Sequence, residues 1–393
     1  MVRSVTIGAC CLLFGVLSAF GFIYMGGSFD TSSAGIPNIT NAHVTRPKIV
    51  GFLPYWLLGK ADKQYERFIT TLTYFGLALN GDGTIMKTTN PGELEPGWNN
   101  LQREAVSARL KDATEKKLKK SLLIISGDDA VIEQLLIDPV QSATTMMGDV
   151  GPIMKEKGFT DLNLDIETFM EASESSRAKF TQFVSAVKDI LVKEQLGTLS
   201  IDLIPIALLR PKLYDPKALG ALADEVILMT YDYHYSGSLT SGAVAPIGGA
   251  GETVEFDVEV AVREALKIMP KEKILLGIPL YGYQWETIEA ASESATIPGG
   301  SSTASVRRVM EKLRVCTDCT KGIDPYSKEP YLIYKEGGVY NQIYYEDETS
   351  MKEKIALAKK YNLGGVALWA LGYEDDTMLK PLESYKQSFV LTW

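Results

Sequence analysis

The segment Phe159-Thr-Asp-Leu-Asn-Leu-Asp-Ile-Glu167 alternates acidic or amide side chains with aliphatic ones. A period of two is typical of a β-strand, whose successive side chains point to opposite faces of a sheet. One face of this strand carries Asp161, Asn163, Asp165 and Glu167. The same alternation occurs in a solvated edge strand of an open sheet, so the other strands decide where this face points.

Seven further runs rich in β-branched or aromatic residues alternate with amphipathic stretches, such as 178–191 and 254–268, that have apolar residues three and four apart. Such alternation is typical of βα units around a parallel sheet. Because the first run is not followed by a Gly-rich dinucleotide turn, we expect an α/β fold that is a closed (β/α)8 TIM barrel rather than an open doubly wound sheet. The expected strands are 49–53, 71–79, 121–126, 161–167, 199–204, 225–231, 273–279 and 365–370.

One segment between the seventh and eighth expected strands, about 284–345, breaks this pattern. It contains Gly-Gly, Pro and alternating Tyr-rich stretches, such as 331–334 and 339–344. These features predict a small α+β insertion with antiparallel strands at the mouth of the barrel.

The N-terminal residues predict export. Residues 5–25 contain no charged residue and follow Arg3. A helix rising about 1.5 Å per residue would then just cross a hydrocarbon core of roughly 30 Å. A buried core helix is the alternative, but the terminal position and the basic flank favour a signal peptide or an uncleaved signal anchor at 1–27. With Arg3 inside, the remainder faces outward, so we expect an extracytoplasmic protein that is membrane-anchored or secreted.

Residues 28–47 are rich in Ser, Thr, Gly, Asn and Pro and predict a flexible linker, with a formal glycosylation sequon at Asn38, before a barrel spanning 48–393. Cys10 and Cys11 fall in the apolar segment. Cys316 and Cys319 form a C-x-x-C motif, which could be half a zinc site, a redox pair or a local disulfide.

A disulfide is the expectation for this motif. Zinc needs about four ligands, and the two histidines, His43 and His234, offer no second cluster. An outward-facing domain would also favour the oxidised pair. We therefore expect no metal and no cofactor.

The charge balance excludes one class of partner. The chain has 40 basic and 49 acidic residues, for a formal charge of -9. This charge repels phosphate backbones, so we expect no nucleic acid partner. The protein is expected to act as a monomer.

Carboxyl groups inside a barrel indicate chemistry. Barrel interiors are usually filled by branched aliphatic side chains, and buried carboxylates cost several kcal/mol unless they are paired. Because adjacent carboxylates cannot easily both ionise, one keeps a proton near neutrality, as a general acid must. Glu167 lies at the carboxyl end of its strand, where barrel active sites lie, so we expect it to be the proton donor and Asp165 to be its charged partner.

The segment 159–167 resembles the D-G-x-D-x-D-x-E signature of glycoside hydrolase family 18, the chitinases and their relatives. Met229-Thr-Tyr-Asp232 resembles the M-x-Y-D motif of that family, and Trp369 resembles its eighth-strand tryptophan. The resemblance covers about residues 48–385. Stretches that look especially like the branch of spore-cortex-lytic N-acetylglucosaminidases are Ile278-Pro-Leu-Tyr-Gly-Tyr283, Tyr231-Asp-Tyr-His-Tyr-Ser-Gly and Gly242-Ala-Val-Ala-Pro-Ile.

This resemblance implies retaining hydrolysis of β-1,4-linked N-acetylglucosamine polymers, either peptidoglycan strands or chitin-type oligosaccharides, with assistance from the substrate. Glu167 would protonate the glycosidic oxygen while the 2-acetamido carbonyl attacks the anomeric carbon. Asp165 would orient the acetamido group, and Tyr231 would donate to its oxygen. Asp232 would bind a sugar hydroxyl, and Trp369 would form an apolar floor beneath the sugar. Further substrate-binding candidates are Asn163, Met229 and Tyr281, together with Tyr55 and Trp56, for which core packing is the alternative.

The sequence departs from the chitinase pattern at several positions. Thr160 stands where the first aspartate is usual, Asp161 where glycine is usual, and Asn163 where the middle aspartate is usual. Asparagine at that last position resembles the spore-cortex branch. The third-strand stretch Ser126-Gly-Asp only partly resembles S-x-G-G. Asp161 adds a side chain deep in the barrel for which the sequence offers no explanation.

Three other functions compete with this interpretation. A non-catalytic lectin-like barrel at the cell surface typically lacks the terminal glutamate or its aspartate neighbour, and both are present here. A metal-dependent hydrolase would need more histidines. A purely structural envelope protein would not need several strand-end motifs that converge on one mouth.

Overall fold

The computed structural model describes residues 43–392. The expected membrane segment at 1–27, most of the linker, Asn38, Cys10 and Cys11 lie outside the described residues. Within the described part of the chain, none of the helices combines the length and the hydropathy that a membrane crossing requires.

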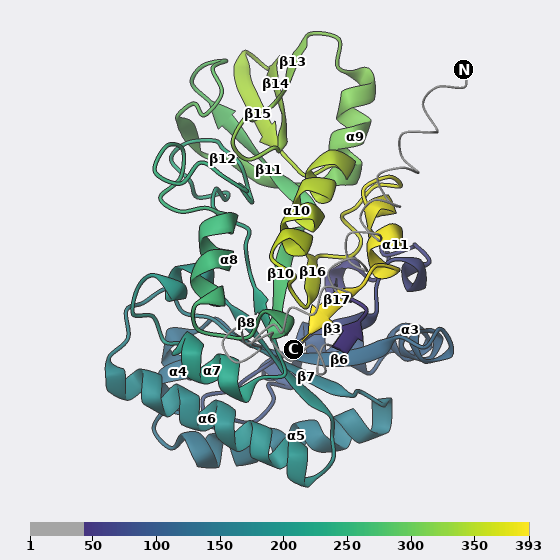
Figure 1. The fold of residues 1–393 in the computed structure, drawn as a ribbon, viewed down its shortest axis with the longest axis vertical. Coiled ribbons are helices and arrows are strands. Elements are labelled where there is room, and N and C mark those ends of the chain that lie inside the picture. The colour runs from purple at the N-terminus through teal and green to yellow at the C-terminus, as the bar shows by residue number, and fades with distance from the viewer. Residues whose placement is uncertain (1–42, 393) are drawn as a thin grey trace, which may run out of the picture. The chain divides into compact units, whose positions relative to one another are not determined.

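Eight parallel strands close into a barrel in the order β10-β16-β2-β3-β6-β7-β8-β9 (Figure 1). All eight expected strands and the expected barrel are therefore confirmed. The sixth ends at Leu228, three residues earlier than expected, because Thr230 N donates to Leu228 O in a turn. The barrel strands are β2 Lys48–Pro54, β3 Thr71–Ala78, β6 Lys119–Ser126, β7 Asp161–Ile166, β8 Thr198–Leu203, β9 Glu225–Leu228, β10 Ile274–Pro279 and β16 Gly365–Trp369.

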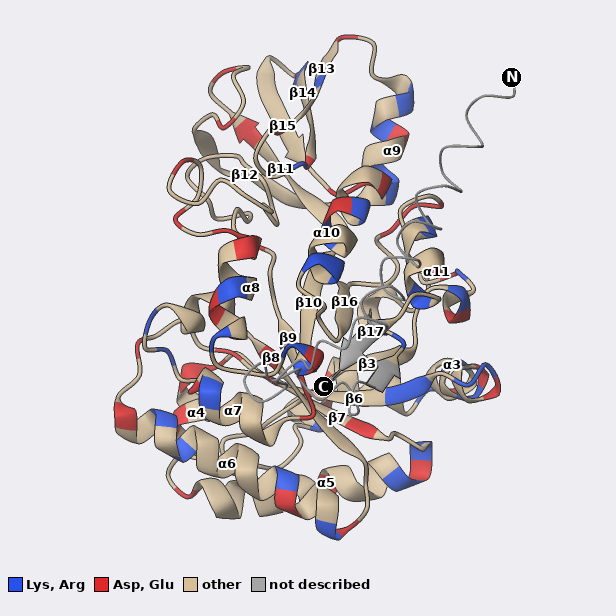
Figure 2. Ribbon diagram, in the orientation of Figure 1, with Lys and Arg blue, Asp and Glu red and all other residues tan. Residues whose placement is uncertain are grey.

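Helices connect and surround these strands. On α5 and α6, acidic and basic positions are interspersed (Figure 2). The helices are α2 Pro96–Leu101, α3 Glu104–Glu115, α4 Asp129–Leu135, α5 Pro139–Lys157, α6 Glu174–Lys193, α7 Pro216–Leu222, α8 Val258–Leu266, α9 Val306–Val315, α10 Glu348–Lys360 and α11 Lys380–Lys386.

The expected helical stretch 254–268 is only partly helical. The Asp257 side chain accepts from Val260 N at 2.8 Å and caps α8, so the helix begins at Val258. Val254, which fitted the apolar spacing, lies in the preceding loop. That loop contributes to the cavity described below.

The two faces of β7 pack as expected. Leu162, Leu164 and Ile166 belong to the core between the barrel and its helices. The alternate residues of β7 therefore point inward. The apolar part of the barrel interior comes from other strands and consists of Val50, Phe52, Phe75, Leu123, Ile227, Leu275 and Ala367.

The insertion is a five-stranded antiparallel sheet in the order β12-β11-β15-β14-β13, with α9 (Figure 1). It begins at Tyr281, three residues before the expected boundary, because β10 continues into β11 after Leu280. Its strands are β11 Tyr281–Thr287, β12 Thr296–Ser305, β13 Cys319–Ile323, β14 Pro330–Glu336 and β15 Val339–Tyr344. Short strands elsewhere are β1 His43–Thr45, β4 Thr88–Asn90, β5 Glu93–Leu94 and β17 Val390–Thr392.

A disulfide joins Cys316, just after α9, to Cys319 at the start of β13. This pairing confirms the expected oxidised state of the C-x-x-C motif. The bond fixes the short connection between the helix and the edge strand of the insertion.

Candidate active site

Asp161, at the start of β7, joins three barrel strands. Its carboxylate accepts from Ser121 Oγ at 2.6 Å, Thr198 Oγ1 at 2.6 Å and Ser200 Oγ at 2.7 Å. Burial and the charge of Glu225 raise its pKa to about 7, although the three hydroxyl donors oppose the rise. These contacts supply the explanation for Asp161 that the sequence lacked: it ties β6, β7 and β8 together.

Asn163 continues this polar chain toward the carboxyl end of the barrel. Its Nδ2 donates to Ser200 Oγ at 3.1 Å and to Asp202 Oδ1 at 2.9 Å. Asn163 is 1% exposed and does not border the cavity. The residue therefore contacts the neighbouring strand, and its expected contact with substrate has no counterpart in this geometry.

Asp165 and Glu167 hydrogen-bond to each other through their carboxyl groups. Such a bond requires one proton, because two carboxylates can only accept. Burial raises the pKa of both groups. The rise is larger for Asp165, which is 4% exposed, and the hydrogen bond from Asp165 lowers the pKa of Glu167 in part. We expected the shared proton on Glu167, but in the free protein burial favours Asp165 as its carrier.

A cavity of about 1120 Å³ opens above this pair. Its wall contains residues from the ends of several barrel strands, as active sites of this architecture do. The expected site residues that border it are Asp165, Glu167, Met229, Tyr231, Asp232 and Trp369. The arrangement therefore brings together a proton-bearing carboxyl pair, polar groups and an aromatic ring in one concave site.

Asp232 and Tyr281 lie together at the side of the cavity. Tyr281, which is buried outside the cavity wall, donates through its hydroxyl to Asp232 Oδ1 at 2.5 Å. The backbone of Asp232 has φ of 60°, in the left-handed region that few residues other than glycine, asparagine and aspartate adopt. The insertion, through β11, thus holds an unusual backbone conformation within the site.

Trp369 is the last residue of β16 and belongs to an aromatic group. Its ring centroid lies 4.7 Å from that of Phe75 and 6.3 Å from that of Trp56. Trp56 is 46% exposed, whereas Tyr55 packs against the core, and neither borders the cavity. Trp56 therefore extends the aromatic group beyond Trp369, and Tyr55 packs edge-on against Trp56.

Sequence reasoning missed several cavity residues. Asp202 could have been found from the sequence. It lies two residues after Ser200 in a correctly predicted strand, so the period of two places both side chains on the same face. The loop 253–256 gave no signal of a site, because Val254 fitted the apolar spacing of a helix. The other missed residues that border the cavity include Phe75, Tyr283, Tyr233 and His234.

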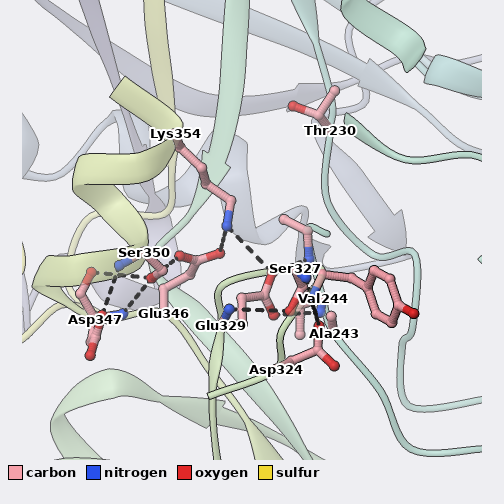
Figure 3. Close-up of polar contacts among 12 residues, drawn as sticks. Thr230, Ala243, Val244, Asp324, Ser327, Glu329, Glu346, Asp347, Ser350 and Lys354 are labelled. Atoms are coloured by element: carbon pink, nitrogen blue, oxygen red, sulfur yellow. Dashed lines mark hydrogen bonds and ion pairs between the residues drawn. The ribbon is translucent and has the colours of Figure 1, made fainter. Parts of the chain in front are cut away.

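A buried ion network links the insertion to the loop that follows β9 (Figure 3). Lys354 Nζ on α10 lies 2.5 Å from Glu346 and 3.4 Å from Glu329, and all three side chains are fully buried. Glu329 also accepts from Val244 N and Ala245 N, each at 2.7 Å. We call Lys354, Glu346 and Glu329 the insertion ion network. It fixes the loop whose first residues border the cavity.

Comparisons with known proteins agree with this geometry. The profile of Glycosyl hydrolases family 18 matches residues 40–374. The cortical fragment-lytic enzyme of Bacillus subtilis (strain 168) is 26% identical over 327 residues, which cover 80% of this chain and 67% of that enzyme.

Two crystal structures have the same fold. The spore cortex-lytic enzyme SleL of Bacillus cereus matches with a TM-score of 0.68 at 22% identity, over 88% of this chain and 75% of that one. The Group IV chitinase of Ostrinia furnacalis matches with a TM-score of 0.73 at 18% identity, over 88% of this chain and 100% of that one. The similarity to spore-cortex-lytic proteins expected from the sequence is confirmed.

Proposed function

The chain belongs to glycosyl hydrolase family 18 and is a glycosidase, and from this premise we propose that it hydrolyses β-1,4-linked polymers containing N-acetylglucosamine. The observation that carries the proposal is the carboxyl pair Asp165–Glu167, which holds one proton inside a closed barrel and borders a large cavity. A glycosidic oxygen in that cavity could receive the proton as the bond breaks.

In the proposed mechanism Glu167 is the acid and the substrate supplies the nucleophile. The 2-acetamido carbonyl attacks the anomeric carbon, so no carboxylate of the protein forms a bond to the sugar. An acetamido N–H near Asp165 favours the ionised form of that carboxyl, which moves the shared proton to Glu167. Tyr231 lies in the same wall and would donate to the acetamido oxygen.

The remaining wall residues would hold the sugar ring. Trp369 presents a flat apolar ring suited to the C–H face of a pyranose. Asp232, which already accepts from Tyr281 and Tyr283, would use a remaining lone pair to accept from a sugar hydroxyl. Both contacts would orient the anomeric carbon toward the carboxyl pair.

For the substrate we propose peptidoglycan glycan strands, with chitin-type oligosaccharides as the second candidate. Both contain the acetamido group that the mechanism needs. Similarity to a cortical fragment-lytic enzyme supports the first candidate, and the fold shared with a chitinase supports the second. The cellular compartment of the protein also bears on the choice between these two substrates.

We further propose that the protein works outside the cytoplasm. The apolar run 5–25 supports export, and the Cys316–Cys319 disulfide supports an oxidising compartment. A cell-wall substrate would be accessible there.

The test is hydrolysis of purified peptidoglycan and of chitooligosaccharides by the wild type and by Glu167→Gln. We expect the variant to lose at least about a hundredfold in kcat, because it removes the general acid while keeping the side-chain volume. Near-full turnover by the variant would show that Glu167 is not the acid. Cellooligosaccharides, which lack the acetamido group, should not be cleaved, and their efficient cleavage would exclude assistance by the substrate.

A further inference from the structure

Asp202 on β8 adds a third carboxyl group beside the pair described above. It is 3% exposed and borders the cavity together with Asp165 and Glu167. Its chain neighbours Ile201 and Leu203 belong to the core outside the barrel, so the Asp202 side chain points inward. We call Asp165, Glu167 and Asp202 the carboxyl cluster. The mechanism proposed above gives no role to its third member.

Asn163 attaches Asp202 to the strand that carries the pair. Asn163 on β7 is the register partner of Ser200 on β8. The next inward-facing residues of the two strands, Asp165 and Asp202, are therefore neighbours. Asn163 Nδ2 donates to Asp202 Oδ1 at 2.9 Å. Asn163 also stands where the middle aspartate of the resembled signature is usual. The carboxyl absent from β7 therefore has a counterpart one strand away, and the amide between them fixes its position.

The cluster has more acceptors than donors. Within residues 43–392, Asn163 Oδ1 and Asp165 Oδ1 are buried without a hydrogen-bond partner. A buried oxygen without a hydrogen-bond partner destabilises the fold. A protonated carboxyl carries no charge and offers an O–H donor. This environment therefore favours protonated over ionised carboxyl groups.

Basic side chains do not neutralise the cluster. Among the described residues that border the cavity, none is lysine or arginine. Burial raises the pKa of Asp202 well above its usual value; the bond from Asn163 opposes the rise, and Glu167 and Asp161 add to it. The titratable groups that face Asp202 are Asp161, Asp165 and Glu167 on or just after β7, Tyr231 after β9, and Tyr214 before α7.

We propose that Asp202 is a positioning residue of the active site, which keeps the proton shared by Asp165 and Glu167 within that pair at neutral pH. The inference rests on the function proposed above. In a group of adjacent carboxyls, each ionisation is opposed by the charges already formed. Three carboxyls therefore release their last proton at a higher pH than two would, and a general acid depends on that proton.

The experiment is the pH profile of kcat/KM on a chitooligosaccharide for the wild type and Asp202→Asn. The substitution preserves shape and can keep a hydrogen bond to Asn163, so the variant should fold. We expect the basic limb of the profile to move by about one unit to lower pH, because one opposing charge is gone. At neutral pH kcat should fall about tenfold, with little change in KM. A limb that coincides with that of the wild type would overturn the proposal.

Two further variants separate this role from simple packing. The exchange Asn163→Asp/Asp202→Asn returns the third carboxyl to the cluster from the other strand, and it should bring the limb back toward the wild-type position. Asp161→Asn also removes a buried carboxyl from the barrel, but Asp161 does not border the cavity. Its basic limb should move less than that of Asp202→Asn, because the charge of Asp161 acts on Asp202 and not directly on the pair. If Asp161→Asn moved the limb as far as Asp202→Asn, the effect would be general and the proposal would fail.

A measurement on the free protein separates this proposal from the proposed function. Carboxyl ¹³C NMR titration follows the Asp165–Glu167 pair without any substrate. We expect its upper midpoint to move to lower pH in Asp202→Asn. That shift would support the role of Asp202 even if the wild type cleaved neither polymer, in which case the proposed function would be at fault. An unmoved midpoint would overturn the role of Asp202 even if the wild type were an active glycosidase.

Discussion

The molecule contains two groups of buried acidic side chains that are satisfied in opposite ways. The insertion ion network surrounds its two carboxylates with a lysine and with backbone N–H donors, and it is fully buried (Figure 3). The carboxyl cluster has no lysine or arginine partner among the described residues of the cavity wall and opens to that cavity. In the insertion ion network the charged groups have partners within the protein. The carboxyl cluster retains protons that it can donate and oxygen atoms that lack a hydrogen-bond donor.

The difference shows how burial alone fails to distinguish structure from function. In the insertion ion network, burial opposes the charge of Lys354, but Glu346 and Glu329 raise its pKa above the usual value. Burial also raises the pKa of Glu346, to about 8, but there Lys354 and Ser350 oppose the rise. In the carboxyl cluster, burial and like charge act in the same direction and hold protons on carboxyls. Removing one partner of a buried ion pair leaves an uncompensated charge and destabilises the fold, whereas unpaired carboxyls beside a cavity keep perturbed pKa values of the kind that catalysis uses.

The largest expected effect comes from breaking the ion network. Lys354→Met leaves two buried carboxylates without their cation, and we expect the free energy of unfolding to fall by about 3–5 kcal/mol, measured in urea. Lys352→Met is the matched control on the same helix, because its ion pair with Glu348 is exposed and should cost at most about 1 kcal/mol. Equal losses in the two variants would contradict the distinction. Adding Glu346→Gln to Lys354→Met should recover part of the loss.

A smaller effect on stability is expected from Asp161. Its carboxyl group is intermediate between the insertion ion network and the carboxyl cluster, because it accepts hydrogen bonds from three hydroxyls but has no cation as a partner. Its pKa of about 7 in the folded protein exceeds the usual 3.8, so the folded state binds more protons between these values. The free energy of unfolding should therefore decrease as pH rises toward 7. Between pH 5 and 7 the wild type should lose about 2 kcal/mol that Asp161→Asn does not lose.

The control for this slope is Asp224→Asn. Burial alone would raise the pKa of Asp224, but hydrogen bonds from Lys188 and Leu199 N lower it below the usual value. Asp224 is therefore ionised in both states above pH 5, and its replacement should leave the slope unchanged. Urea unfolding at several pH values measures both variants. Parallel slopes for the wild type and Asp161→Asn would refute the prediction.

The smallest effect on stability is expected from Asp165→Asn. Replacing a poorly satisfied buried carboxyl by an amide should change the free energy of unfolding by less than about 1 kcal/mol, or increase it. The same variant should lose at least about a hundredfold in kcat, because it removes the partner in proton sharing. Thermal unfolding and substrate hydrolysis test the two halves. Loss of several kcal/mol would place Asp165 with the structural group.

Local patterns predicted the barrel well. Each strand was predicted from its own residues, although the sixth ends three residues early. The period of two in 159–167 separated the acidic face from the aliphatic one, and the eight strands together placed the acidic face inside the barrel. The same logic applied to 199–204 would have identified Asp202, but two polar residues in a short strand give a weaker signal than four. The start of α8 was misplaced because apolar spacing does not show a cap, and Asp257 provides one.

Features that depend on distant contacts were not predictable. Which carboxyl of the pair carries the proton depends on how deeply each is buried, and no local pattern encodes that. Lys354 resembles any helical lysine in the sequence, yet it is fully buried and paired with Glu329 of the insertion and with Glu346, which follows β15. The reason for Asp161 was equally hidden, since its three hydroxyl donors come from β6 and β8.

The hydrogen bonds from Val244 N and Ala245 N to Glu329 make the insertion difficult to remove. A shortened protein that joined β10 directly to α10 would leave two amide donors and an ammonium group stranded in the interior. Trimming this glycosidase, or grafting its barrel into a chimera, therefore requires carrying the insertion along or redesigning the loop after β9 at the same time.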